Sequence, residues 1–180
     1  VIAHELTVVG SHGMAAADFH VEDEVVETHF GRRFRALKTL GDRVARHPLT
    51  TGNRIETLET GDAAYAAMLA AIAAAERSII LESYIFDRDP LGLRIADALI
   101  GAHRRGVAVR VLIDAVGARY SVPSIAGHLR EGGVAVDVFN GNIIVGLRLP
   151  YANLRTHRKI IVVDGTVGFM GGMNIREGFT

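Results

Sequence analysis

The sequence has 180 residues, of which 49% are hydrophobic and 22% charged, and its formal net charge at pH 7 is zero. This length and balance fit one folded domain and exclude a basic protein that binds nucleic acid through bulk charge. The absence of cysteine excludes disulfide bonds and thiolate metal sites, and it is compatible with a reducing cytoplasm.

The N-terminal third is predicted to differ from the remainder. We expect residues 1–50 to be an extension of uncertain role, of which 1–19 could be a foreign segment, and we assign it no function. One helix face is predicted from Val26, Phe30, Leu37 and Val44, and the same helix carries Arg32, Arg33, Arg35 and Lys38. This pattern is typical of either an interfacial basic helix or a packing helix with a solvated side. The widely spaced His4, His12, His20 and His29 do not predict a metal site.

From residue 51 onward, strand and helix signals alternate. Strands are expected at 54–58, 78–86, 107–114, 134–139 and 157–163. Asp62 is the predicted cap of a first helix that buries Tyr65, Met68, Leu69 and Ile72. Asp89 and Pro90 start a second, with Ile95, Leu99 and Ala102 inward and Gly106 at its end, and a third runs through Ile125 and Leu129 to Gly132. The alternation indicates an α/β domain over 51–180, built as a sheet with helices on its faces.

No membrane-spanning helix is expected. The Ala-rich run at 63–75 is too short to cross a bilayer, is interrupted by Tyr65, and is flanked by charged residues. Peripheral membrane contact is compatible with this pattern.

Three residues of the stretch THRKIIVVDG form a His-x-Lys-x4-Asp pattern: His157, Lys159 and Asp164. Because β-branched residues follow and Asp-Gly is a hairpin signal, we expect a strand that carries the histidine and the lysine on one face and then turns. A neutral imidazole can attack phosphorus, and an ammonium two residues on can neutralise the phosphate oxygens. The pattern predicts phosphoryl transfer. Within this catalytic group we interpret Asp164 as a turn and scaffold residue rather than a base.

The segment after the turn is predicted to bind the substrate phosphate. Gly171 and Gly172 allow a phosphate to approach the backbone closely, and Asn174 offers an amide donor to its oxygens.

Two carboxylates of the predicted sheet are supporting residues. Glu82 lies within an apolar strand, and Asp114 lies at the end of another, where sites of α/β proteins gather. The alternative for each is structural: Glu82 pairs with an arginine or caps a backbone group, and Asp114 starts a turn.

The loop 140–153 is rich in apolar residues without a sustained period. Because it precedes the motif directly, one hypothesis is that it contacts acyl chains or a membrane surface. The alternative is an ordinary hairpin packed on the core.

These residues resemble the phospholipase D superfamily, and within it the bacterial cardiolipin synthase branch. The likeness runs from Asn53 to about Phe179, and it includes ERSIILESYIFDRDPLG and YANLRTHRKIIVVDGTVGFMGGMNIREGF. It implies a phospholipase D-like mixed sheet flanked by helices, as one lobe of an enzyme that normally has two.

The resemblance also implies roles for the motif. His157 would be the nucleophile that forms a phosphohistidine, Lys159 and Asn174 would bind phosphate, and no metal or other cofactor would be required. Family enzymes place two such motifs face to face, whereas this chain holds one. The carboxylate that orients the family's imidazole follows the motif, and here only Glu177 follows Asn174. We therefore expect a first lobe separated from its partner, or a chain that pairs with another copy.

The leading hypothesis is a phosphatidyltransferase that converts phosphatidylglycerol to cardiolipin, while water as acceptor would give phospholipase D activity. The alternatives are a homodimeric single-motif phosphodiesterase or nuclease, and an inactive lobe. The expected partners are a phospholipid and a second motif-bearing lobe or homodimer partner, and not nucleic acid. The expected location is peripheral, on the cytoplasmic side of the bacterial inner membrane.

Overall fold

The computed structural model describes residues 6–11, 32–46, 53–140 and 154–179. The chain divides into two compact units, Val1–Val9 with Ile55–Thr180 and Gly10–Arg54, and each unit is described by itself. The apolar loop 141–153 lies outside the described residues, as do Val26 and Phe30.

The described helix of the smaller unit is α2 (Arg32–Ala45). Lys38 Nζ donates to Asp42 Oδ2 at 2.8 Å, one helical turn further on. Such a pair stabilises an isolated helix by about 0.2–0.5 kcal/mol, so most of its stability has to come from elsewhere.

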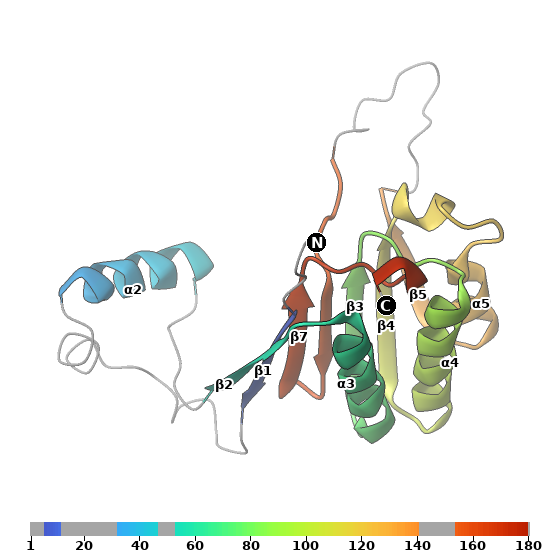
Figure 1. The fold of residues 1–180 in the computed structure, drawn as a ribbon, viewed down its shortest axis with the longest axis horizontal. Helices are drawn as coiled ribbons and strands as arrows, with labels where there is room; N and C mark the ends of the chain where they lie inside the picture. The colour runs from blue at the N-terminus through green and yellow to red at the C-terminus, as the bar shows by residue number, and fades with distance from the viewer. Residues whose placement is uncertain (1–5, 12–31, 47–52, 141–153, 180) are drawn as a thin grey trace. The chain divides into compact units, whose positions relative to one another are not determined.

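The larger unit is built on a seven-stranded sheet in the order β2-β1-β7-β6-β3-β4-β5 (Figure 1). Its strands are β1 (Leu6–Ser11), β2 (Asn53–Leu58), β3 (Ser78–Ser83), β4 (Ala108–Asp114), β5 (Ala135–Phe139), β6 (Ile160–Val163) and β7 (Val167–Gly171). β3, β4 and β5 are parallel, whereas β6 is antiparallel to β3 and β7 is antiparallel to β6. The predicted mixed sheet is confirmed, and β3 lies where the parallel and antiparallel parts meet.

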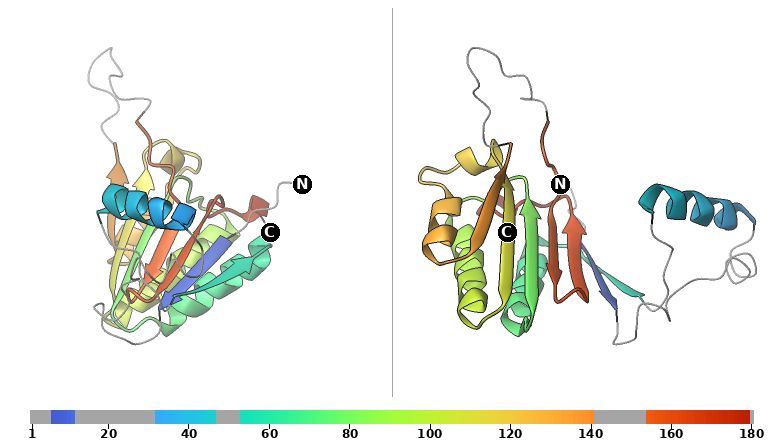
Figure 2. Two further views of the ribbon diagram at one scale, coloured as in Figure 1. Left: turned by 90° about the vertical axis from the view of Figure 1, so that its left-hand side faces the viewer. Right: turned by 180° about the vertical axis from the view of Figure 1, so that it is seen from behind.

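Three helices cover one face of this sheet: α3 (Gly61–Ala74), α4 (Pro90–Arg104) and α5 (Ile125–Glu131). They lie in front of the strands in Figure 1 and behind them when the molecule is turned by 180° in Figure 2. α4 connects β3 to β4 and α5 connects β4 to β5, as parallel strands require. Two short 3-10 helices, η2 (Gly117–Arg119) and η3 (Glu177–Phe179), follow β4 and β7.

The helix starts were predicted with mixed success. α4 begins as expected, because Asp89 Oδ1 accepts a hydrogen bond from Gly92 N at 2.7 Å and Pro90 follows it. The prediction of Asp62 as the cap of α3 was wrong, since Thr60 Oγ1 accepts from Ala63 N at 3.2 Å. Asp62 lies in the first turn, where a carboxylate favours the helix dipole.

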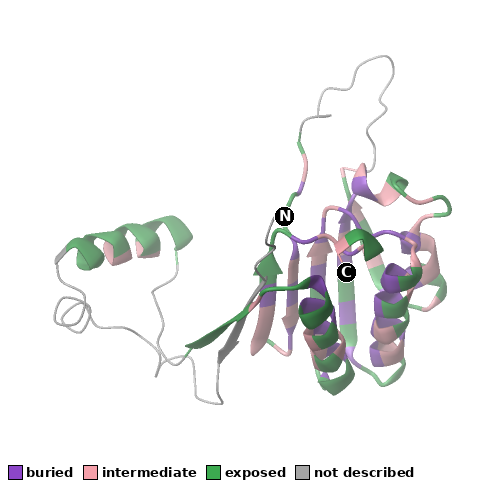
Figure 3. Ribbon diagram, viewed as in Figure 1, coloured by how far each residue is buried: buried purple, intermediate pink, exposed green. Residues whose placement is uncertain are grey.

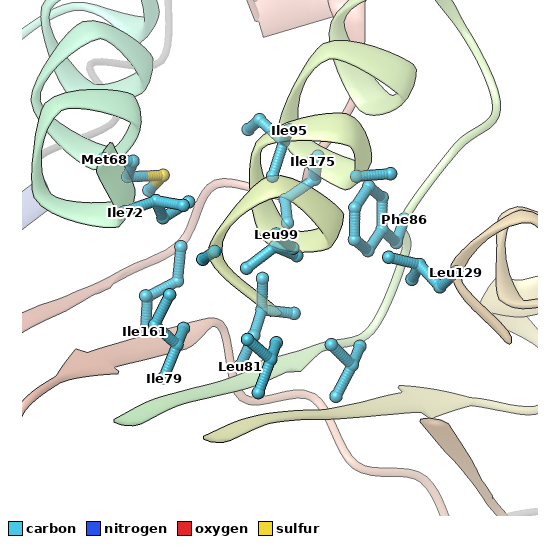
Figure 4. Packing of buried hydrophobic residues seen from close by; sticks show 14 of the residues in the cluster. Met68, Ile72, Ile79, Leu81, Phe86, Ile95, Leu99, Leu129, Ile161 and Ile175 are labelled. Carbon is cyan, nitrogen blue, oxygen red and sulfur yellow. The ribbon is translucent and has the colours of Figure 1, made fainter. Parts of the chain in front are cut away.

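The hydrophobic core lies between the helices and the sheet (Figure 4). Along each central strand alternate residues point to the helices, so Ile79 and Leu81 are buried whereas Ile80 is 54% exposed. The fully buried helix residues include Ile72, Ile95, Leu99 and Leu129. In Figure 3 the buried residues follow the sheet-facing sides of these helices. This core fixes the strands whose ends carry the motif.

Candidate active site

Most of the predicted site residues lie at one end of the central strands, the carboxyl end of β3. Because β6 is antiparallel to β3, with Ile160 opposite Glu82, the residues that precede β6 lie beside the carboxyl end of β3. β7 runs antiparallel to β6, with Met170 opposite Ile160, so Gly171 and the residues after it lie at this same end of the strands. The sheet therefore brings the region of His157 to that of Asn174.

The motif segment 154–159 is not part of a strand. We predicted that the strand would start at His157, but β6 starts at Ile160. The physical reason is that side-chain carboxylates, rather than a neighbouring strand, bind the backbone and side chains of this segment.

Asp114 is the first of these carboxylates. It is fully buried at the end of β4, and its Oδ2 accepts from Thr156 N at 3.1 Å. Its Oδ1 accepts from Val116 N at 2.8 Å and from Arg155 Nη1 at 3.3 Å. Asp114 therefore both starts a turn and holds the residues that precede His157.

Glu82 is the second carboxylate. Its Oε1 accepts a hydrogen bond from the Thr156 hydroxyl and lies 3.8 Å from Arg158 Nη1. Thr156 is thus held through its amide by Asp114 and through its hydroxyl by Glu82. Both carboxylates constrain the chain on either side of His157 rather than the imidazole itself.

The histidine and the lysine of the motif meet at the ring of Tyr84, which follows β3. The Tyr84 and His157 ring centroids are 4.8 Å apart with the ring planes tilted by 48°, and Lys159 Nζ lies 5.4 Å from the Tyr84 centroid. The His157 residue is exposed, whereas Lys159 is only 7% exposed. Lys159 Nζ donates to His157 O at 2.8 Å, and burial lowers the pKa of this ammonium.

Asn174 is oriented by a backbone amide. Its Oδ1 accepts from Ile85 N at 3.2 Å, which leaves the Nδ2 group as the donor of the side chain. The Tyr65 hydroxyl donates to Asn174 O at 2.6 Å, and burial raises the pKa of Tyr65 to about 12, so this hydroxyl keeps its proton at neutral pH. Gly171 and Gly172, which precede Asn174 closely, are exposed.

Asp164 lies at the opposite end of the strands, beside the start of β3. Its carboxylate accepts from the amides of Glu76 at 2.9 Å, Arg77 at 2.8 Å and Ser78 at 2.8 Å. These hydrogen bonds, that from Glu76 first, lower the pKa of Asp164. Asp164 and Gly165 have φ values of 53° and 70°, and Thr166 N donates to Val163 O, so the predicted Asp-Gly hairpin is confirmed. The structure does not bring Asp164 to the imidazole.

Glu177, the carboxylate that follows Asn174, lies in η3. It is exposed, and its backbone amide donates to Asp89 Oδ2 at 2.6 Å. Arg176, next to it, lies with its Nε 3.3 Å from Asp87 Oδ2. These contacts attach the segment after Asn174 to the start of α4.

An open cleft of about 330 Å³ lies in front of the motif. Leu112 and Phe139 give it an apolar wall, while His157 and Arg158 line it from the motif segment. The cleft therefore offers an apolar surface next to the exposed imidazole.

Sequence reasoning missed Tyr84, Tyr65 and Thr156. Tyr84 was assigned to a longer strand, 78–86, and Tyr65 was assigned to the core through its helical spacing. Only the position of Thr156, directly before His157, could have signalled a role. The contacts of all three residues join parts of the chain that are far apart in sequence.

Within the described ranges, no group of three or more histidine or acidic side chains is placed to hold a metal ion. The helices of these ranges are also too short or too polar to cross a membrane.

Comparison with known proteins identifies the family. The family model described as "Cardiolipin synthase, PLD-like domain" matches residues 68–178. The chain belongs to this family. Its resemblance to the phospholipase D superfamily is thereby confirmed.

The cardiolipin synthase-like chain has relatives that are much longer than itself. It is 38% identical to a cardiolipin synthase of Alkalihalophilus pseudofirmus over 82% of this chain and 29% of the relative. It is 35% identical to cardiolipin synthase A of Pseudomonas aeruginosa over 90% of this chain and 33% of the relative. Among solved structures, the phospholipase D family member Nuc from Salmonella typhimurium is similar, with 28% identity, a TM-score of 0.49, and coverage of 63% of this chain and 65% of that chain.

Proposed function

We propose that this chain is the nucleophile-bearing lobe of a phosphatidyltransferase that makes cardiolipin from phosphatidylglycerol through a phosphohistidine. The observation that carries the proposal is the buried ammonium of Lys159 beside the exposed His157. The relatives named above carry the name cardiolipin synthase, which agrees with it.

The buried ammonium calls for an anion. A buried charge is costly unless it is paired. Within the part of the chain that the structure describes, Lys159 forms no ion pair, because Glu82 and Asp114 bind the segment before it. Lys159 Nζ has three donors, of which one is used by His157 O. The phosphate of a substrate would accept from the remaining donors and supply the missing negative charge.

The proposed reaction has two steps. The neutral His157 imidazole attacks phosphorus, a P–N bond forms, and the P–O bond to glycerol breaks. The leaving oxygen takes a proton from a general acid, which we assign to the histidine of a second motif. The hydroxyl of a second phosphatidylglycerol then attacks phosphorus and gives its proton to the histidine of the second motif, which the first step left deprotonated. The P–N bond breaks, and cardiolipin leaves. Lys159 Nζ and Asn174 Nδ2 stabilise the phosphate oxygens as charge gathers on them.

The apolar wall of the cleft favours a lipid over a nucleic acid. Leu112 and Phe139 lie beside His157, and the two arginines that line the cleft, Arg155 and Arg158, lie 3.3 Å from Asp114 and 3.8 Å from Glu82. A groove for nucleic acid should instead carry an excess of basic charge. The formal net charge of zero points the same way.

The nucleophile can be tested without the second lobe. A phosphatidyl ester of p-nitrophenol releases p-nitrophenolate, which leaves without being protonated. We expect one equivalent of p-nitrophenolate per chain and an acid-labile phosphatidyl-enzyme. His157→Asn should give neither product, because it removes the attacking nitrogen.

The matched control is His128→Asn. His128 lies on α5 and pairs at the surface with Asp97 at 2.7 Å, so this variant should keep the burst. A full burst from folded His157→Asn would refute the proposed nucleophile.

We further propose that the protein binds peripherally to the cytoplasmic surface of the inner membrane, which is anionic, and that α2 makes this contact. The apolar Phe34, Leu37, Leu40 and Val44 share one side of this helix by their spacing, whereas Arg35 lies on the opposite side. Such a helix can lie in the plane of a bilayer surface that carries negative charge.

Replacing Leu37 and Leu40 of α2 together with serine should weaken binding to phosphatidylglycerol vesicles by about tenfold or more, because apolar area leaves the bilayer. Vesicle sedimentation measures this. Val122→Ser, at a residue that is 93% exposed in the larger unit, is the control and should bind as before. Equal binding by all three proteins would contradict the role of α2.

A further inference from the structure

We propose that Tyr84 is a positioning residue of this site, whose ring sets the orientation of the His157 imidazole and holds Lys159 in its charged form. This inference rests on the proposed function of His157 and Lys159. It adds an aromatic group that neither the motif nor the family comparison assigns.

The place of Tyr84 in the fold suits a positioning role. It follows the carboxyl end of β3, and the amide of the next residue, Ile85, orients Asn174. Two adjacent residues therefore contact all three groups that act on the phosphate: His157 and Lys159 through the Tyr84 ring, and Asn174 through a backbone amide.

The ring of Tyr84 fits both neighbours. A tilted pair of aromatic rings at 4.8 Å is within the separation at which such pairs attract, and it limits the rotation of the imidazole. A cation 5.4 Å from a ring centroid is within the range of a cation–π interaction, which favours the charged form of the amine.

Among the groups around Lys159, the Tyr84 ring is the one that we expect to stabilise the charged amine. From β3, Glu82 lines one small cavity together with Lys159, but its Oε1 accepts from Thr156 and lies 3.8 Å from Arg158, and no ion pair joins it to Lys159 among the described residues. From its own segment, His157 contributes a backbone carbonyl. The other packing elements present Met68 from α3, and Phe169 and Met173 from β7 and the segment after it. Burial lowers the pKa of Lys159. A cation–π interaction with the Tyr84 ring would act in the opposite direction, because it favours the charged amine.

The backbone of Tyr84 is itself fixed. A Cβ atom added at Gly117 of η2 would lie 1.5 Å from Tyr84 O, so the two backbones are in direct contact. The ring is therefore attached to a fixed point of the fold, which a positioning role requires.

The sequence allows a direct test, because it contains only two lysines, Lys38 and Lys159. Protein labelled with ¹³C at the lysine Cε should give two side-chain signals, and Lys38→Arg identifies the signal of Lys159. Titration of that signal measures the ionisation of Lys159 without any substrate.

Tyr84→Leu should lower the titration midpoint of Lys159 by about 0.5–1 pH unit, because the cation–π interaction is lost. Tyr84→Phe keeps the ring and should restore the midpoint of the unaltered protein. Tyr120→Leu, at a tyrosine that is 57% exposed, controls for the loss of a tyrosine elsewhere. If Tyr84→Leu does not fold, Tyr84→Met gives the same comparison. An unchanged midpoint in a folded variant without the ring would overturn the inference.

The burst assay separates this inference from the proposed function. Tyr84→Leu should slow the p-nitrophenolate burst by about 2- to 12-fold, as expected from the loss of one aromatic pair, and Tyr84→Phe should rescue it. If His157→Asn abolishes the burst while Tyr84→Leu changes neither burst nor midpoint, only the role of Tyr84 fails. If His157→Asn keeps the burst, the proposed function fails, whereas the lysine midpoints still test the Tyr84–Lys159 contact.

Discussion

At the scale of single residues, the site separates groups that would touch the phosphate from groups that hold them. Lys159 Nζ and Asn174 Nδ2 still have N–H groups available for hydrogen bonds, and they lie at the carboxyl end of β3 near the exposed His157. Glu82 and Asp114 instead satisfy Thr156 and its neighbours. A donor that is still available is suited to binding a ligand, whereas a carboxylate that already binds the polypeptide has a structural role.

Asp164 provides the clearest test of this distinction. Asp164→Asn keeps a residue that tolerates positive φ but removes one acceptor of the amides at 76–78. We expect a loss of about 1 kcal/mol in the free energy of unfolding at pH 7, a small value because the group is near solvent. Urea denaturation measures this loss. The folded variant should keep the p-nitrophenolate burst.

The stability that Asp164 contributes should depend on pH. The pKa of Asp164 is lowered in the folded state, so its contribution to stability is present above the unfolded pKa and is lost as pH falls through the folded value. The difference in stability between the unaltered protein and the Asp164→Asn variant should therefore shrink on acidification below about pH 4. A folded variant that lacks the burst would show that Asp164 acts in the chemistry.

At the scale of elements, strand direction decides where the motif lies. Because β6 is antiparallel to β3, the chain before β6 lies at the carboxyl ends of β3 and β4. The turn after β6 consequently lies at the start of β3, where Asp164 binds Ser78 N. A parallel β6 would have reversed these two locations.

The contact between η2 and the end of β3 can be tested with two glycines. Gly117→Ala should lower the free energy of unfolding by about 2–3 kcal/mol and slow the burst, because a methyl group there meets Tyr84 O. Gly101→Ala in α4, where a Cβ meets nothing within 4 Å, should instead add about 0.5–1 kcal/mol. Urea denaturation measures both. Equal stability of the two variants would contradict the close approach at Gly117.

At the scale of the whole molecule, one motif accounts for half of the proposed reaction. The chain spans 29% of the length of the relative from A. pseudofirmus. In the proposed reaction this chain would supply the nucleophile and the donors that bind phosphate. In the proposed reaction the proton for the leaving glycerol comes from a second motif, and general acid catalysis contributes about 10²–10⁴-fold.

Cardiolipin formation from phosphatidylglycerol should therefore be at least about 100-fold slower with this chain alone than with a second motif-bearing lobe added. Thin-layer chromatography of labelled lipid measures the product. The p-nitrophenolate burst should not depend on the added lobe, since its leaving group needs no proton. Equal cardiolipin synthesis by the monomeric chain would contradict the need for a second motif.

The sequence by itself determined the local features of this protein. The Asp89 cap of α4, the buried face of α4 and the Asp-Gly hairpin were predicted because each depends on residues within a few positions of one another. The buried face of α3 was predicted except for Leu69, which is only partly buried. The roles of His157, Lys159 and Asn174 were predicted from spacing and resemblance, and they stay predictions.

Only the tertiary structure decided how these residues meet. Glu82, Tyr84 and Asp114 reach the motif segment across 41 or more positions of sequence, through a strand order that no local pattern encodes. For the same reason the strand predicted to start at His157 starts at Ile160, where backbone pairing replaces the side-chain hydrogen bonds that hold the segment before it. Local propensity selects helices and strands, whereas the burial of their apolar faces selects which ends lie together.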